Sequence, residues 1–275
     1  MCENKKIRFI AASALCVLSL VANAQTTMRI EFMGGDCVDY PVSSIKCISF
    51  ANEQTPTTPD NTPSGLEAVD LGLSVKWANM NIGATTPEDY GDYFAWGETV
   101  GYNGGKDTFN QRTYKYYMLT NTTDENGANR TVYGYTKYIE KASALRYGYD
   151  GFYDDKTVLD PEDDTAIANW GGSWRMPTKD ELDELRKKCT WTWTTENGIK
   201  GYKVTGQNGN SIFLPAAGYR VDGSLDNVGS YGYFWSSSLN AGFSGYAYRL
   251  YFYPSSVSVN YFCRDYGFSV RAVCL

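Results

Sequence analysis

The 275-residue sequence contains no histidine. This absence excludes Ser-His-Asp and Cys-His catalysis, ordinary His-ligated zinc sites and an imidazole base that titrates near neutral pH. The sequence also has too few basic residues to form a basic stripe, with 25 Lys and Arg against 31 Asp and Glu and a net charge of −6. Because phosphate contacts need clustered Lys and Arg, we expect no nucleic-acid or anionic-membrane partner.

Long apolar runs are scarce as well, and none approaches the roughly 20 residues that a membrane span requires. The N-terminus instead has the composition of a secretory signal peptide. Lys5, Lys6 and Arg8 precede an apolar run that ends in small residues at Ala24. The sequence predicts a signal peptide over residues 1–24 and a secreted, extracellular or cell-surface location.

The rest of the chain divides into three segments by composition. Residues 25–51 alternate apolar and polar side chains around a double glycine and predict a β-hairpin, in which Cys37 and Cys47 are candidates for a disulfide. Residues 52–65 are rich in Pro and Thr and predict an exposed linker. Residues 66–275 are long enough for one domain with a sizeable core.

Two helices are expected in the middle of this domain. Asp160 precedes Pro161 and is expected to N-cap the first helix. Thr178 and Glu181 have the spacing of a capping box for the second helix, and its apolar stripe extends to Cys189. We expect ordered tyrosine-rich loops over residues 101–153, with one short helix near 137–145, because that stretch is polar and glycine-rich.

The C-terminal third predicts successive strands with short connections, so neighbouring strands should be antiparallel. The sequence therefore predicts an α+β fold with two short helices and a mostly antiparallel sheet, preceded by the small N-terminal hairpin. The strand that starts at Tyr246 should turn near Pro254 and return, which would bring residues 260–266 beside residues 239–245.

Several motifs in this order resemble a known family. They are VDLGLSVKWANMNIG, YFAWGE, WGGSWRMPTKDELDEL, NGNSIFLPAAGYR, GYFWSSS and YGFSVRAV. Together they resemble the major paralogous domain first described in Fibrobacter succinogenes, which is common in secreted bacterial proteins. That family is similar to the C-type lectin-like fold, and more distantly to the formylglycine-generating, sulfatase-modifying enzymes. The resemblance implies a domain whose first and last strands meet, and it implies no catalysis by itself.

The resemblance also bears on the cysteines and on metal binding. In C-type lectin-like folds a helix cysteine often bridges to the last strand, which implies a disulfide between Cys189 and Cys274. The sulfatase-modifying enzymes hold copper with two nearby cysteines, whereas Cys263 stands without a close second cysteine. The lectin calcium ligands are expected about where this chain has Trp235-Ser236-Ser237, and serines are poor substitutes for carboxylates. We therefore expect neither metal nor cofactor.

An acidic cluster offers a second possible metal or glycosidase site. Its members are Asp154, Asp155, Asp160, Glu162, Asp163 and Asp164. The spacing fits no EF-hand, and carboxylates at this place commonly cap a helix or match its dipole. We interpret the cluster as structural.

The strongest functional pattern is a stretch rich in Tyr, Ser, Asn, Gly and Phe over residues 236–268. Antibody loops use the same residue types, because rigid aromatics supply contact area and small polar residues supply adaptable hydrogen bonds. The candidate ligand-binding residues are Asn240, Phe243, Tyr246, Asn260, Tyr261, Phe262, Asp265 and Tyr266. The alternative is that these aromatics only pack the domain, since such a cluster is informative only where it is exposed.

The sequence thus favours a non-catalytic binding or adhesion module, secreted or at the cell surface, that recognises a protein or a glycan. One alternative is an enzyme of the sulfatase-modifying or carbohydrate-active type. Others are a fimbrial tip within a surface assembly and a display protein diversified by a retroelement, since the tyrosine-rich tail is similar to the variable tails of such proteins.

Overall fold

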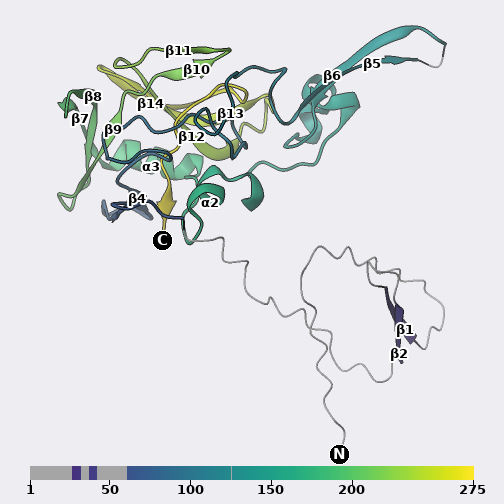
Figure 1. Ribbon diagram of the computed structural model, residues 1–275, viewed down its shortest axis with the longest axis horizontal. Helices are drawn as coiled ribbons and strands as arrows, with labels where there is room; N and C mark the ends of the chain where they lie inside the picture. Colours follow the sequence, from purple (N-terminus) through teal and green to yellow (C-terminus); the bar gives the residue numbers. More distant parts are fainter. Residues whose placement is uncertain (1–26, 32–36, 42–60, 125) are drawn as a thin grey trace, which may run out of the picture. The chain divides into compact units, whose positions relative to one another are not determined.

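The computed structural model describes residues 27–31, 37–41, 61–124 and 126–275 (Figure 1). The chain separates into two compact units, Met1–Thr57 and Thr58–Leu275. In the first unit, strands β1 (Thr27–Glu31) and β2 (Cys37–Pro41) pair antiparallel, as the alternating pattern predicts. The predicted signal peptide and Cys47, the expected partner of Cys37, lie outside the described residues.

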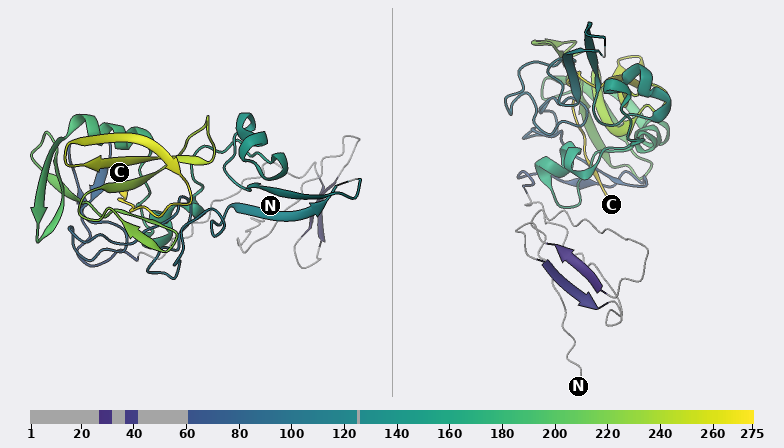
Figure 2. Two further views of the ribbon diagram at one scale, coloured as in Figure 1. Left: turned by 90° about the horizontal axis from the view of Figure 1, so that it is seen from above. Right: turned by 90° about the vertical axis from the view of Figure 1, so that its right-hand side faces the viewer.

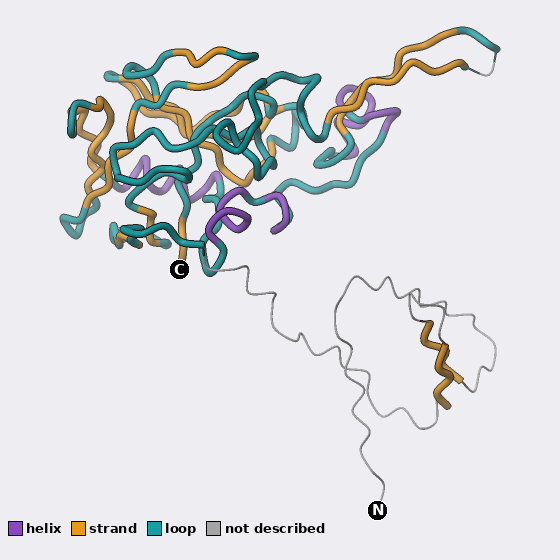
Figure 3. The backbone as a smooth tube through the Cα atoms, in the orientation of Figure 1, coloured by secondary structure: helices purple, strands orange, loops and turns teal. Residues whose placement is uncertain are grey.

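The second unit contains short helices and many strands joined by long loops (Figure 3). Its helices are η2 (Lys141–Ser143), α1 (Ala144–Tyr147), η3 (Tyr149–Gly151), η4 (Pro161–Asp163), α2 (Thr165–Trp170) and α3 (Lys179–Lys188). Its strands are β3 (Ala68–Val69), β4 (Lys76–Ala78), β5 (Tyr117–Thr123), β6 (Asn129–Tyr135), β7 (Thr190–Glu196), β8 (Ile199–Thr205), β9 (Ser211–Pro215), β10 (Tyr219–Val221), β11 (Ser224–Asp226), β12 (Gly232–Leu239), β13 (Tyr246–Tyr253), β14 (Ser256–Cys263) and β15 (Val273–Cys274).

The named strands pair antiparallel throughout the described part of the chain. Three-stranded sheets form from β12-β13-β14, from β7-β8-β9 and from β15-β4-β3, and two-stranded pairs form from β5-β6 and β10-β11. This mixed, mostly antiparallel architecture with few helices agrees with the predicted α+β class.

The β12-β13-β14 sheet has different neighbours on its two faces, because successive side chains along a strand point to opposite sides. On one face, Leu250 and Phe252 of β13 pack with Leu182 and Leu185 of α3 in one apolar cluster. On the other face, Trp235 of β12 belongs to the larger apolar cluster. We call these the α3 face and the Trp235 face.

Helix α3 follows its predicted boundaries closely. The Thr178 hydroxyl accepts a hydrogen bond from Glu181 N, and the Glu181 carboxylate accepts one from Thr178 N, which completes the capping box. Leu182 and Leu185 are buried on the predicted stripe. The sequence thus predicted this helix from local signals alone.

The last strand closes the domain against its beginning. Val273 pairs with Trp77 and Cys274 pairs with Lys76, while β4 pairs on its other side with β3. The fully buried Arg271 joins the same region, since its guanidinium donates to Ala78 O and to Asn81 Oδ1. The two ends of the domain therefore lie on adjacent strands.

Two local predictions of secondary structure were wrong. Asp160 does not cap a helix through its side chain; it precedes the 3₁₀ turn η4, and Asp164 caps α2 by accepting from Ala166 N and Ile167 N. The stretch expected as loops contains the β5-β6 hairpin, which extends away from the three-stranded sheets (Figure 2).

Candidate functional site

An exposed aromatic surface lies on the α3 face of the sheet, beyond the N-terminus of α3. Its central residue is Tyr261 on β14, which is 46% exposed, and Phe243, in the loop before β13, is 41% exposed. We call it the Tyr261 surface, and its members are Arg146, Tyr147, Lys179, Phe243, Tyr246, Tyr248 and Tyr261. It combines exposed rings with cations at its rim.

Ring contacts hold the Tyr261 surface together. Tyr261 stacks on Phe243 at 6.3 Å between ring centroids and meets Tyr246 and Tyr248 edge-on at 5.8 and 6.0 Å. Tyr248 lies opposite Tyr261 in the strand register, which places both rings on the same side of the sheet. These rings therefore support one another within the protein itself.

Two cations border these rings at opposite ends. Lys179 Nζ lies 4.8 Å from the centroid of Tyr248, and the Arg146 guanidinium lies 5.8 Å from Phe243 and 5.1 Å from Tyr147. A cation within about 6 Å of a ring is attracted to its face. The Tyr261 surface therefore offers apolar contact at its centre and hydrogen-bond donors at both ends.

The Trp235 face carries a different arrangement around Arg249 of β13, a side chain only 5% exposed. Its guanidinium lies 4.7 to 5.4 Å from the centroids of Tyr233, Tyr251, Phe262 and Phe268. We call this the Arg249 box. Burial lowers the pKa of Arg249 to about 10, so the group stays protonated at neutral pH.

The structure divides the predicted ligand-binding residues between these two faces. Phe243, Tyr246 and Tyr261 lie together on the Tyr261 surface, whereas Phe262 points to the opposite side and packs against Arg249. The return of β14 beside β13 is as predicted. Successive side chains of a strand point to opposite faces of the sheet, and this rule could have assigned Tyr261 and Phe262 to different faces from the sequence.

Four other predicted residues are largely internal. Asn240 is 6% exposed, and its Oδ1 accepts from Gly242 N within the turn before β13. Asn260 is half-buried opposite Arg249, and Tyr266 packs edge-on against Phe262 at 4.9 Å between centroids. Asp265 is 9% exposed, and burial raises its pKa.

Sequence reasoning missed several members of both sites. Tyr248 and Arg249 lie within the predicted strand, and the alternation that placed Tyr246 outward also places Tyr248 with it and Arg249 on the other face. Arg146 and Lys179 come from distant parts of the chain. No spacing rule links those two residues to β13, so only the fold could reveal them.

The acidic cluster is neutralised by lysines. Asp160, Glu162 and Asp163 each bring a carboxylate oxygen within 4.8 Å of the others, a spacing that could hold a metal ion. However, Lys137 Nζ lies 2.7 Å from Asp160 Oδ2 and 2.5 Å from Asp163 Oδ2. The ammonium group takes the place between the carboxylates that a cation would need, which fits the structural interpretation of this cluster.

The serines at the expected lectin calcium position make hydrogen bonds to the backbone. Ser236 Oγ donates to Tyr248 O at 2.8 Å, and Ser237 Oγ lies 3.4 Å from Pro177 O. Both serines are buried. Their hydroxyls therefore serve backbone hydrogen bonds within the sheet region.

The predicted disulfide between Cys189 and Cys274 is wrong. Both residues are free thiols, as is Cys263. Cys189 ends α3 and packs beside the apolar cluster under that helix, while Cys274 on β15 belongs to the larger cluster near Trp170 and Trp174. The two thiols lie in different cores, so the implied connection does not form.

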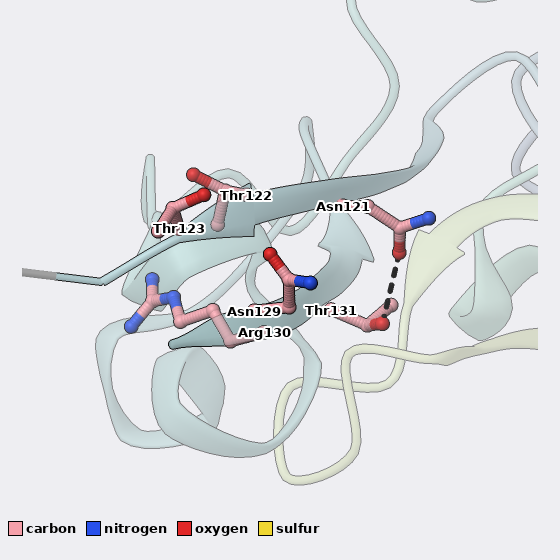
Figure 4. Close-up of a pocket in the computed structure, with 6 residues that line it drawn as sticks. All are labelled: Asn121, Thr122, Thr123, Asn129, Arg130 and Thr131. Carbon is pink, nitrogen blue, oxygen red and sulfur yellow. Dashed lines mark hydrogen bonds between the residues drawn. The ribbon is translucent and has the colours of Figure 1, made fainter. Parts of the chain in front are cut away.

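Two shallow hollows lie on the surface of the described residues. One of about 390 Å³ lies on the β5-β6 hairpin, where Thr131 Oγ1 donates to Asn121 Oδ1 across the strands (Figure 4). A second of about 320 Å³ is lined in part by Glu98, Lys106 and Lys115, and Lys106 pairs there with Glu98 at 2.7 Å. Neither hollow coincides with the two aromatic sites. None of the described helices is long and apolar enough to cross a membrane.

A family model described as "Domain of unknown function (DUF8237)" matches residues 136–273. The chain belongs to this family. The DUF8237 segment begins just before η2 and ends on β15, so it contains every member of the Tyr261 surface and of the Arg249 box. It leaves out β4, the strand with which β15 pairs. No curated protein and no solved structure matches the chain.

Proposed function

We propose that this protein is a non-catalytic binding or adhesion module that recognises a protein or a glycan through the Tyr261 surface. The observation that carries the proposal is the pair of stacked, exposed rings of Phe243 and Tyr261. Exposed aromatic clusters bordered by polar groups are typical of interaction sites. Rigid rings also lose little conformational entropy on binding, which favours affinity.

We also propose a C-type lectin-like fold of the major paralogous type, exported by the signal peptide over residues 1–24. The meeting of β4 with β15 supports this fold, because the first and last strands of such a domain lie together. The hydroxyls of Ser236 and Ser237 are engaged with backbone carbonyl oxygens, which supports recognition without the calcium site of sugar-binding lectins.

The test is a binding screen of the purified secreted chain on a glycan array and on immobilised cell-surface proteins. For the partner so found, the double variant Phe243→Ala/Tyr261→Ala should weaken binding at least tenfold while circular dichroism stays unchanged. Tyr153→Ala is the matched control, since Tyr153 is equally exposed at 46% but makes its ring contact with Lys141 instead. Equal loss in both variants, or none in the double variant, would contradict the proposed surface.

A further inference from the structure

Strand β14 forms one edge of the β12-β13-β14 sheet. It pairs with β13 along all eight of its residues, and no other strand of the described residues pairs with its outer side. None of the eight residues of β14 is buried, whereas seven of the eight residues of β12 are. Each residue of β14 therefore keeps contact with solvent.

The hydrogen-bond pattern shows which backbone groups of β14 face outward. The carbonyl oxygen of Tyr248 accepts from Ser236 Oγ of β12, so the backbone of Tyr248 faces away from β14. Tyr261 lies opposite Tyr248, and in an antiparallel pair its own N–H and C=O must then face away from β13. This direction alternates along the strand, so Val257 and Val259 face outward as well. Their N–H and C=O groups have no backbone partner among the described residues.

Strand β14 lacks the features that usually protect an exposed edge. Natural edge strands carry charged side chains, prolines or bulges, which discourage pairing with another chain. Residues 256–263 read SVSVNYFC and include no charged residue and no proline. Their register with β13 is continuous, in contrast to the register between β12 and β13, which shifts. Such an edge is suited to accept a further strand.

This edge adjoins the Tyr261 surface. Tyr261 directs its backbone outward and its side chain to the α3 face, where the ring stacks on Phe243. Every second side chain of an added strand would point to the same face. An apolar side chain placed there would extend the stack of Tyr261 and Phe243, and the Arg146 guanidinium lies 5.8 Å beyond the Phe243 centroid.

The cations of the Tyr261 surface favour an acidic partner. Neither Arg146 nor Lys179 belongs to an ion pair within the described part of the chain, whereas Lys137 pairs with three carboxylates. A second copy of this chain that paired through β14 would bring no carboxylate, because residues 256–263 contain no acidic side chain. The free cations thus favour a different protein over a second copy.

We propose that β14 accepts an extended segment of a partner protein as an additional strand. The segment would place an apolar side chain beside Phe243 and Tyr261 and an acidic side chain at Arg146. Backbone hydrogen bonds to the edge would supply affinity, and the two side chains would supply specificity. This inference rests on the proposed function, because it assigns a peptide as the ligand of the Tyr261 surface and specifies the mode of binding.

The test begins with a phage library of short random peptides, selected on the purified secreted chain. The selected peptides should combine an acidic residue with an aromatic or aliphatic one. N-methylation at alternate positions of the tightest peptide should weaken binding at least tenfold, because it removes the N–H donors that face β14. N-methylation at the intervening positions should change the affinity little. Failure to select any peptide, or a uniform response to N-methylation along the peptide, would overturn the proposal.

Variants of the chain test the same strand from the other side. Val259→Pro removes an outward N–H and no hydrogen bond to β13, so it should abolish peptide binding with little change in the melting temperature. Val259→Ala is the matched control, since it keeps the N–H and should bind the peptide as the wild-type chain does. The N-methylation result stands whether or not Val259→Pro folds. Arg146→Glu should weaken binding at least tenfold, and a peptide with lysine in place of its acidic residue should bind this variant again.

The outcomes separate this inference from the proposed function. A glycan whose binding is lost in Phe243→Ala/Tyr261→Ala but kept in Val259→Pro would overturn the added strand and leave the Tyr261 surface as the binding site. Peptide binding that survives both the double variant and Val259→Pro would overturn both proposals. Sedimentation velocity provides the last check, because a wild-type dimer that Val259→Pro dissociates would assign the edge to a second copy and overturn the partner proposed here.

Discussion

Lys137 Nζ lies 2.5 Å from Asp163 Oδ2, and the Asp163 side chain is only 2% exposed. Asp163 also accepts a hydrogen bond from Tyr138 Oη and pairs with Lys115. Burial by itself would raise the pKa of Asp163, but the hydrogen bonds from Lys137 and Tyr138 outweigh it and lower the pKa to about 2. The carboxylate therefore stabilises the fold through its charge.

This relationship predicts a loss of stability in acid. A lowered folded-state pKa contributes stability above the unfolded pKa near 4, and the contribution disappears as the pH falls from about 4 to about 2. The contribution amounts to about 2.5 kcal/mol, at about 1.4 kcal/mol for each pKa unit. Urea denaturation of the wild-type chain and of Asp163→Asn across this range measures it. The variant should be less stable at pH 7, and its free energy of unfolding should change less between pH 4 and pH 2. The same pH dependence of the free energy of unfolding in both proteins would contradict the role of Asp163.

Removal of Arg271 should be far more damaging than removal of Arg249. Arg271→Met would leave Asn81 Oδ1 and the carbonyl oxygens of Ala78 and Phe213 without a donor. Each orphaned buried acceptor costs about 1–3 kcal/mol, so we expect a loss of at least about 3 kcal/mol in the free energy of unfolding. Thermal denaturation with Arg249→Met as the matched control checks this, and equal effects of the two substitutions would contradict it.

The capping box should contribute measurably to α3. Thr178→Ala removes the hydroxyl that accepts from Glu181 N and should lower the free energy of unfolding by about 1 kcal/mol. Ser173→Ala is a suitable control, since Ser173 is exposed and lies outside the helix. Chemical denaturation of both variants provides the comparison, in which a similar cost for both would show that the cap contributes little.

The free cysteines should react with iodoacetamide without prior reduction. Cys189 and Cys263 are half-buried, whereas Cys274 is 6% exposed, so Cys274 should be alkylated last in the folded protein. Burial raises the pKa of all three thiols, which should keep every rate low at neutral pH. Peptide mapping under non-reducing conditions gives the order, and a Cys189–Cys274 linked peptide would contradict the structure.

Local signals made part of the fold predictable. The capping box at Thr178 and the hairpin of β1 and β2 depend on residues close in sequence, and both were predicted. The β5-β6 hairpin was missed because most of its residues are exposed on both faces, which leaves no apolar alternation to detect.

The candidate sites were predictable only in part. The composition of residues 236–268 located Phe243, Tyr246 and Tyr261, which do lie together on one surface. The Arg249 box depends on rings from four separate strand or loop positions. It also depends on the lack of an acceptor for Arg249 Nε and Nη1 among the described residues. An unsatisfied donor is a property of the assembled core, so composition and periodicity cannot reveal it.

The pairing of β15 with β4 has a consequence for how the domain can be cut and rejoined. Its two ends leave from neighbouring strands, so a short linker could join them and new ends could be opened at the exposed Asn208-Gly209 turn. A fragment limited to residues 136–273 would lack the strand that β15 requires and two acceptors of Arg271. The whole domain from β3 to β15, rather than the matched segment alone, is therefore the unit to transfer into another protein.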